Sequence, residues 1–170
     1  MTYYVDYVWS DGKIVTQYIT VSSSVNTPSF IYIPANTAIP SKIIYDDNGM
    51  PQGFIFGDGV QFAFVRNLQG DVIAVVDQNG NIIIEYSYGP WGDIQYHLNK
   101  KYFSTEKDAQ IFIELCPLTY RGYNYDVTTG LYYLQSRYYN PEWGRFINCD
   151  DKKKHIPCCH FPILPLLLRR

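Results

Sequence analysis

Charged residues are scarce in this sequence, and the two signs nearly cancel. Asp, Glu, Lys and Arg make up 18% of the 170 residues, where roughly a quarter is usual. The 14 basic and 16 acidic residues leave a formal charge of -2, so we expect no general attraction to nucleic acid and no nucleic-acid partner. Disorder is not expected either, because disordered chains combine low hydrophobicity with high net charge.

Long apolar segments are missing as well. The longest apolar run covers 161–168 and contains two prolines, which makes it too short to span a bilayer. No signal peptide is recognised, because the first residues hold no basic stretch followed by an apolar run. We therefore predict that this sequence contains no membrane span.

The cysteines do not indicate a disulfide framework, because two of the four are isolated and two are adjacent. Four potential ligands for a soft metal crowd into one proline-broken segment: His155, Cys158, Cys159 and His160. Zinc sites in proteins draw their ligand pairs from two separate turns, with two to four residues inside each pair. We therefore predict no metal site and no cofactor.

Sets of residues typical of catalysis are absent too. The sequence shows no Ser, His and Asp set, no phosphate-cradling glycine loop and no basic patch interleaved with aromatic residues. Stripes of tyrosine could stack on sugar rings, but their spacing of two residues is also what a layered β-core requires. We favour core packing for these stripes and predict that the chain is not an enzyme.

Aromatic residues, by contrast, are plentiful. They make up 17% of the chain, and 17 residues are Tyr. An aromatic ring covers a large area while the hydroxyl of Tyr stays in contact with water, so this composition favours stacked strands over helices.

The first region, 1–41, is predicted to form a hairpin followed by a polar loop. Thr2–Trp9 and Lys13–Val21 are β-rich runs joined by Ser-Asp-Gly, a hairpin signal. The stretch 22–40 is rich in Ser, Asn, Thr and Pro and holds one short strand, Phe30–Ile33. Because an unpaired first strand invites association, we expect the chain to be a fragment whose preceding strands are absent.

The second region, 42–151, contains a repeated strand-turn unit. Lys42–Gly49 is a strand that runs into a Tyr-Asp-x-x-Gly turn, and the same spacing recurs from Tyr125 with one extra residue before the glycine. Degenerate copies lie at 76–80 and 88–92. This repetition predicts an array of strands and tight turns.

The most regular part is 53–94, where Val60–Leu68, Asp71–Asp77 and Asn81–Tyr88 are predicted strands. Their short connections predict antiparallel neighbours, and hence a β-meander. Alternation in the third strand predicts one face of Ile82, Ile84, Tyr86 and Tyr88, opposite Ile83, Glu85 and Ser87.

Residues 96–118 break this pattern. Ser104 is expected to cap a short helix over Glu106–Gln110, and a strand is expected over Ile111–Leu115. The chain as a whole is therefore predicted to be mainly antiparallel β-structure with at most one short helix.

The most distinctive stretch is 120–151, which reads YRGYNYDVTTGLYYLQSRYYNPEWGRFINCDD. It gathers aromatic residues around two turn signals, at 126–130 and 140–144. Leu131–Tyr139 is predicted to be a single extended strand. Alternation then predicts one face of Tyr132, Leu134, Ser136 and Tyr138, and another of Tyr133, Gln135, Arg137 and Tyr139.

This stretch resembles the core-domain signature of Rhs, or YD-repeat, proteins, whose pattern is roughly YRGYxYDxxTGLYYLxxRYYDPxxGRFxxxD. The resemblance covers most of 43–151 and, more loosely, the hairpin at the start. It implies an all-β fold, mainly antiparallel, in which a hairpin array is a fragment of a spiral β-shell and 152–170 is an irregular, variable tail. It also implies structural roles for Tyr125, Asp126, Gly130, Tyr132, Tyr133, Arg137, Tyr138, Tyr139, Pro141, Gly144, Arg145 and Phe146.

The resemblance also raises self-cleavage, because an aspartyl-protease-like arrangement at the end of the family core releases the C-terminal segment. Arg137 and Asp150 are the two candidate residues that this sequence retains. Asn140 replaces a family Asp, and no DPxGL motif follows Asp151. Since paired carboxylates share a proton in such chemistry, we predict that the chain does not cut itself and that Arg137 and Asp126 are structural.

The function that the resemblance implies is enclosure. The chain would form the end of a β-shell around a variable C-terminal toxin passenger, which is truncated here to a short tail. The implied partners are upstream YD-repeat strands or that passenger, and the implied location is secreted or at the cell surface. The alternative is a stand-alone Tyr-rich β-sheet module that binds carbohydrate or a cell-surface protein.

Overall fold

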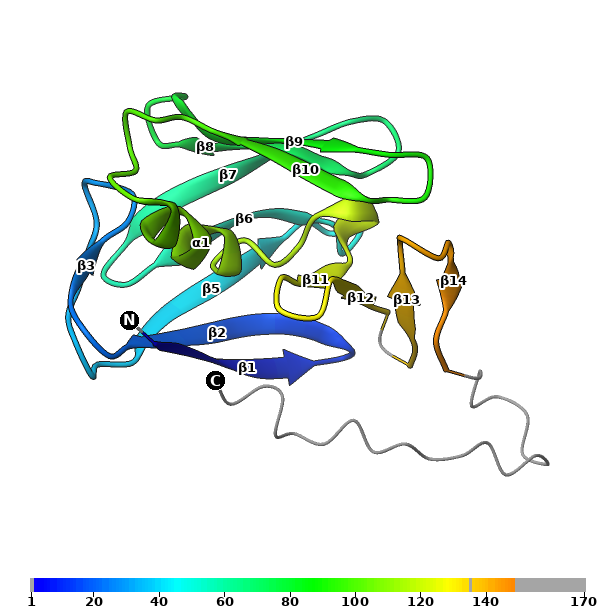
Figure 1. The fold of residues 1–170 in the computed structure, drawn as a ribbon, viewed down its shortest axis with the longest axis horizontal. Coiled ribbons are helices and arrows are strands. Elements are labelled where there is room, and N and C mark those ends of the chain that lie inside the picture. The colour runs from blue at the N-terminus through cyan, green and yellow to red at the C-terminus, as the bar shows by residue number, and fades with distance from the viewer. Residues whose placement is uncertain (1, 135, 149–170) are drawn as a thin grey trace.

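The computed structural model describes residues 2–134 and 136–148, which form one large and two small antiparallel sheets and an α-helix. The large sheet has eight strands in the order β1-β2-β5-β6-β7-β8-β9-β10. Its strands are β1 (Tyr3–Ser10), β2 (Lys13–Val21), β5 (Ile39–Tyr45), β6 (Pro51–Phe56), β7 (Val60–Arg66), β8 (Val72–Asp77), β9 (Ile82–Tyr88) and β10 (Ile94–Leu98). Figure 1 shows this sheet curling around the helix α1 (Glu106–Glu114), with β1 and β10 at its two edges.

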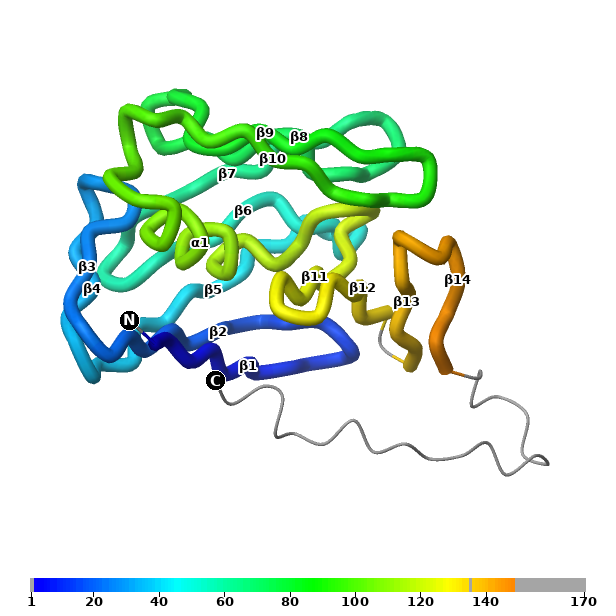
Figure 2. The backbone as a smooth tube through the Cα atoms, viewed as in Figure 1, coloured from blue at the N-terminus to red at the C-terminus, as the bar shows by residue number. Residues whose placement is uncertain are grey.

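The two small sheets lie at opposite ends of the molecule (Figure 2). One pairs β3 (Val25–Asn26) with β4 (Tyr32–Ile33). The other, here called the core-motif sheet, follows the 3-10 helix η1 (Tyr120–Gly122). Its strands are β11 (Asn124–Asp126), β12 (Leu131–Tyr133), β13 (Tyr138–Asn140) and β14 (Arg145–Phe146).

These findings confirm the predicted fold class of mainly antiparallel strands with one short helix. The first hairpin is confirmed as well, since β1 and β2 pair from Tyr3↔Val21 to Ser10↔Lys13. The predicted meander corresponds to β7, β8 and β9. In the large sheet, the sequence analysis missed two strands, β6 and β10. The first begins at Pro51, and the second lies in a stretch with exposed polar residues.

The repeated turns share one hydrogen-bonding pattern. Asp46, Asn67 and Asp77 each direct Oδ1 at the backbone N–H groups two and four residues further on, at 2.8 to 3.0 Å. The glycine that ends each turn has φ between 76° and 89°, a left-handed conformation that costs other residues energy. The turn at 89–92 keeps the backbone hydrogen bonds with Gly89 in the acid's place. The predicted turn array is therefore present, with an additional copy at Asn67.

The main hydrophobic core lies between the concave face of the large sheet and α1. Phe112 of the helix is fully buried, with its ring centroid 5.2 Å from that of Phe62 and 6.3 Å from that of Phe54. The end of the helix is fixed by the buried Gln17 of β2, whose Nε2 donates to the carbonyl of Leu115 at 2.7 Å. The helix thus fills the curl of the sheet and fixes its curvature.

The helix itself corrects two expectations. Its N-cap is Thr105 and not Ser104, because the Thr105 hydroxyl accepts from the Asp108 N–H and the Asp108 carboxylate accepts from the Thr105 N–H. The strand expected over Ile111–Leu115 is the last turn of this helix. Residues 111–113 and 115 are all buried, so packing against the sheet decides their conformation over their β-propensity.

The alternation predicted for β9 was wrong at its start. Val75 pairs with Ile84 and Val76 with Ile82, so Ile83 is the extra residue of a β-bulge. Ile83 and Ile84 are both fully buried, whereas Ile82 is exposed. The bulge therefore turns a residue predicted on the opposite face into the core.

The single strand predicted over Leu131–Tyr139 was also wrong. The chain reverses between β12 and β13, where the Leu134 N–H donates to the Arg137 carbonyl at 2.8 Å. Tyr132 consequently pairs with Tyr139, and Tyr133 with Tyr138, which contradicts the two predicted faces. None of the helices in the described part of the chain is long and apolar enough to cross a membrane.

Candidate functional site

The core-motif sheet is built from two local turns and one buried tyrosine. Asp126 closes the first turn, because its Oδ1 accepts from the Thr128 N–H at 2.9 Å and its Oδ2 from the Thr129 hydroxyl at 2.8 Å. Asn140 closes the second, with Oδ1 accepting from the Trp143 N–H at 3.0 Å. Both turns follow from the side-chain oxygen of an Asp or Asn that binds nearby backbone.

Tyr132 joins this small sheet to the large one. It is fully buried, and its ring packs against those of Tyr125, Tyr120 and Tyr139 at centroid distances of 4.9, 5.8 and 6.4 Å. Its hydroxyl donates to the Gly92 carbonyl at 2.8 Å, and burial raises the pKa of Tyr132 well above its ordinary value. The ring is therefore a neutral donor that holds the 89–92 turn.

A second tyrosine binds the same turn. The Tyr139 hydroxyl donates to the Trp91 carbonyl at 2.8 Å. Next to it, the ring of Tyr120 lies 5.5 Å from that of Tyr88, at the end of β9. Gly144 brings its backbone against the Trp91 ring, 3.3 Å from where a Cβ would stand. The turn between β9 and β10 is thus held by the core-motif sheet.

The remaining predicted motif residues lie just before or after β13, or on β14. The Arg137 guanidinium stacks 3.7 Å from the centroid of the Phe146 ring, and that of Arg145 lies 5.4 Å from the Trp143 ring. Pro141 is buried. Asp150 and the four candidate metal ligands of the tail, at 155–160, lie outside the described residues.

Trp9 is a neighbour that the sequence analysis missed. Its ring meets that of Tyr133 edge-on, with a centroid distance of 5.2 Å and an interplanar angle of 82°. Tyr133 in turn packs against Tyr138 at 5.1 Å. A contact between residues 9 and 133 has no local signal, because only the curl of the large sheet brings the first hairpin to the core-motif sheet.

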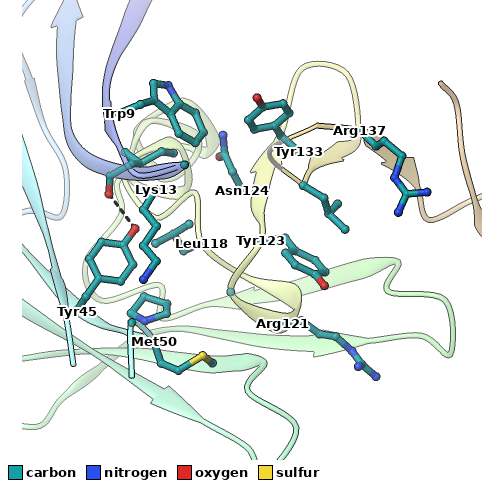
Figure 3. A pocket seen from close by; sticks show the side chains of 16 residues that line it. Trp9, Lys13, Tyr45, Met50, Leu118, Arg121, Tyr123, Asn124, Tyr133 and Arg137 are labelled. Atoms are coloured by element: carbon teal, nitrogen blue, oxygen red, sulfur yellow. Dashed lines mark hydrogen bonds between the residues drawn. The ribbon is translucent and has the colours of Figure 1, made fainter. Parts of the chain in front are cut away.

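An open cleft of about 400 Å³ lies where these parts meet. Figure 3 shows Trp9 and Lys13 from the first hairpin on one side, and Tyr123, Tyr133 and Arg137 on the other. Its positive side chains are Lys13, Arg121 and Arg137, and none of its described lining residues is Asp or Glu. The cleft is therefore electropositive in a chain whose formal charge is -2.

A buried carboxyl group lies elsewhere, at the end of α1. Glu114 is 6% exposed, and its Oε1 accepts from the Tyr3 hydroxyl at 2.8 Å. Burial raises the pKa of Glu114 to about 7, with the Tyr3 hydroxyl opposing the shift and the charge of Asp126 adding to it. The same surroundings raise the pKa of Tyr7 through burial and the charges of Glu114 and Asp126. The sequence analysis gave Glu114 no role, because only the fold buries it.

These residues offer little of what a reaction requires. No group of three or more His, Cys, Asp or Glu side chains that could hold a metal occurs in 2–134 and 136–148. Cys116 is buried, and burial holds the pKa of its thiol well above the ordinary value, which opposes a nucleophilic thiolate. What the site presents is hydroxyl donors, aromatic faces and cations stacked on aromatic rings.

Comparison with known proteins identifies the family. The Teneurin YD-shell family model matches residues 14–156. The chain belongs to the Teneurin YD-shell family. This result confirms the resemblance drawn from the sequence, since the match spans both 43–151 and part of the first hairpin.

Other YD-shell relatives are much longer than this chain. It is 31% identical over 136 residues to "tRNA3(Ser)-specific nuclease WapA" of Bacillus spizizenii, which covers 80% of this chain and 5% of that protein. It is 33% identical over 89 residues to "Double-stranded DNA deaminase toxin A" of Burkholderia cenocepacia, covering 52% of this chain and 6% of that protein.

The fold of this YD-shell segment is similar to a solved structure. The crystal structure of TcdB2-TccC3 without its hypervariable C-terminal region has a TM-score of 0.56 and 19% identity to it, covering 87% of this chain and 8% of the other. At that identity the likeness concerns the fold alone. The strands described above therefore have the arrangement of a segment of a larger molecule.

Proposed function

We propose that this YD-shell segment is a non-catalytic wall element that closes one end of a β-shell around a C-terminal passenger. The observation that carries the proposal is the docking of the core-motif sheet on the large sheet. Tyr132 and Tyr139 hold the backbone of the 89–92 turn, so the small sheet is fixed across the end of the strands. Such a joint supports a closing role.

The edges of the large sheet support the same role. β1 and β10 each pair with one neighbour in the described chain, so each presents an outer row of backbone N–H and C=O groups. An exposed edge pairs readily with another strand. β1 also carries exposed apolar side chains, including Tyr4 and Val8, which are each 45% exposed. The partners expected at these edges are further YD-repeat strands.

The relatives support a role without chemistry of its own. One is named a tRNA nuclease and another a DNA deaminase toxin, yet both share this segment at 31% and 33% identity. A segment common to proteins with two different activities does not determine either activity. We therefore propose that the passenger, and not this wall, differs between such proteins, and that export to the cell surface or beyond accompanies that role.

Sedimentation velocity tests the edge on which the wall role depends. We expect the chain to associate as its concentration rises, because the outer edge of β1 can pair with other copies. The double variant Tyr4→Lys, Val8→Lys places two charges along that edge and should sediment as a monomer. Val65→Lys is the matched control, since Val65 is 40% exposed but lies on β7, inside the sheet.

A wild-type chain that stays monomeric across the range would contradict the edge argument and favour a self-contained module. Loss of association in Val65→Lys would also contradict the edge argument, because a charge added anywhere on the surface would then be enough to prevent association. Circular dichroism of all three proteins identifies a variant that has failed to fold.

A further inference from the structure

The end of α1 holds a carboxyl group where three parts of the fold meet. Glu114 is the last residue of the helix and is buried, and both β1 and β11 lie next to α1 (Figure 1). We propose that Glu114 is a pH-sensitive latch: its protonated form joins β1, α1 and the core-motif sheet, and its ionised form loosens them. This inference goes beyond the wall role and does not depend on it, since every group involved belongs to this chain.

The latch contacts β1 directly. The Tyr3 hydroxyl, at the start of this strand, donates to Glu114 Oε1 at 2.8 Å. In the described chain β1 is an edge strand that pairs with β2 alone, and its inward side chains Tyr3, Val5 and Tyr7 pack against the main core. An edge strand has one neighbour fewer than an interior strand, so its local opening costs less free energy. A change at Glu114 therefore acts on one of the most easily opened strands of the sheet.

The core-motif sheet meets the same place from another direction. Asp126 ends β11, and the next residue, Val127, packs against the main core. The charge of Asp126 contributes to the raised pKa of Glu114, so the two carboxyl groups oppose each other's ionisation. At the other end of β1, the ring of Trp9 meets that of Tyr133 at 5.2 Å. An ionised Glu114 thus repels a sheet that also contacts β1.

No cation offsets this repulsion. None of the Lys, Arg or His side chains in the described chain forms an ion pair with Glu114, and the last turn of α1 holds no basic residue. The end of a helix carries the negative pole of its dipole, which disfavours a carboxylate there. The titratable groups around Glu114 are Tyr3, Tyr7 and Asp126, and burial raises the pKa of both tyrosines, which stay neutral. Only the Tyr3 hydroxyl among these three favours the ionised form.

The direction of the switch follows from these surroundings. They raise the pKa of Glu114 from 4.5 to about 7, with burial as the largest cause. The closed form therefore binds more protons than the open form, and opening becomes easier as the pH rises from about 4.5 to about 7 and changes little above that. The opening constant increases about tenfold for each pH unit inside this interval. Between pH 5 and pH 8 the total increase should be about seventyfold.

Hydrogen exchange of the whole chain, followed by mass spectrometry and corrected for the intrinsic exchange rates, tests the latch. At pH 8 we expect the amides of β1 and of β11–β12 to exchange together, at least about tenfold faster than those of β7 inside the large sheet. Their opening constant should increase about seventyfold from pH 5 to pH 8 in the wild type and stay constant in Glu114→Gln. Glu85→Gln is the matched control, because Glu85 is exposed on β9, and it should behave like the wild type.

Tyr3→Phe gives a second, independent readout. The substitution keeps the ring and removes the hydroxyl that favours the ionised form of Glu114. The pKa of Glu114 should therefore rise further, and the increase in the opening constant should extend to higher pH than in the wild type. A purely structural role for Tyr3 would instead raise the opening constant equally at every pH and leave the pH profile in place.

Exchange of β1 no faster than that of β7 would overturn the proposal, since Glu114 would then act on global unfolding alone. So would an opening constant that is independent of pH in the wild type, an equal pH dependence in Glu114→Gln, or an unchanged pH profile in Tyr3→Phe. Opening of β1 without β11–β12 would contradict the part of the proposal that concerns the core-motif sheet. The sedimentation experiment tests the wall role separately.

Discussion

Replacing Glu114 with Gln should stabilise the protein at alkaline pH. Glu114 is buried at the end of α1, where the Tyr3 hydroxyl donates to it at 2.8 Å. Gln keeps an oxygen that accepts this hydrogen bond but carries no charge. The substitution therefore removes the cost of an ionised group in the core and leaves the local packing nearly intact.

The size and sign of the effect follow from the pKa of Glu114, which burial raises from 4.5 to about 7. An acid with a higher pKa in the folded chain binds more protons when folded, so its contribution to stability is greatest at low pH and is lost as the pH rises through this interval. Each pH unit between the two pKa values corresponds to about 1.4 kcal/mol. Ionised Glu114 should therefore destabilise the fold by about 3 kcal/mol at pH 8, and by less than about 1 kcal/mol at pH 5.

Urea unfolding at both pH values measures the difference. Glu114→Gln should exceed the wild type in free energy of unfolding by about 3 kcal/mol at pH 8 and by under about 1 kcal/mol at pH 5, with unchanged urea dependence. Glu85→Gln is the control, because Glu85 is an exposed residue of β9. A constant difference at the two pH values, or an equal gain in the control, would refute the reasoning.

Gly92→Ala should destabilise the fold more than Gly80→Ala. Both glycines have φ above 80°, but a Cβ at Gly92 would stand 2.8 Å from Tyr120 Cδ1, whereas one at Gly80 meets nothing within 4 Å. Urea unfolding should show a loss of unfolding free energy above about 1 kcal/mol for Gly92→Ala and below about 1 kcal/mol for Gly80→Ala. Arg137→Ala should cost about 1 kcal/mol through the lost stacking on Phe146, and its intact mass should be that of the full, uncut variant chain. Mass spectrometry that found a cut between about 148 and 155 in the wild type, abolished by Asp150→Asn, would contradict the prediction that the chain does not cut itself.

The parts of the fold that could be predicted from sequence are those with a local cause. The turns at Asp46 and Asp77 follow from a side-chain oxygen that binds backbone within four residues, and a glycine at the required position. The first hairpin follows from the two central residues of its turn, Asp11 and Gly12, which both have positive φ. None of these elements depends on a distant partner, so their signal survives in the sequence alone.

The parts that could not be predicted depend on contacts between distant residues. Nothing near Ile83 in sequence marks it as the extra residue of a bulge, because its burial is set by the curl of the large sheet. In the sequence, Tyr133 and Tyr138 lie in what looks like one continuous strand. In the structure, the turn that begins at Leu134 makes them partners on the neighbouring strands β12 and β13. The cleft was missed for the same reason, since Lys13 and Arg121 lie more than a hundred residues apart in sequence and meet only in the fold.

The 89–92 turn shows how the core-motif sheet can fit a wall whose sequence varies. In the other three turns of this form, an Asp or Asn side chain accepts hydrogen bonds from the backbone of its own turn. Here Gly89 has no side chain, and the Asp93 carboxylate occupies that space, with Oδ2 1.8 Å from where a Cβ of residue 89 would stand. This turn is held instead through its carbonyls, because Tyr132 and Tyr139 donate to those of Gly92 and Trp91. A backbone carbonyl is present whatever the side chain, so such a joint requires a turn of the right shape and leaves most of its sequence free.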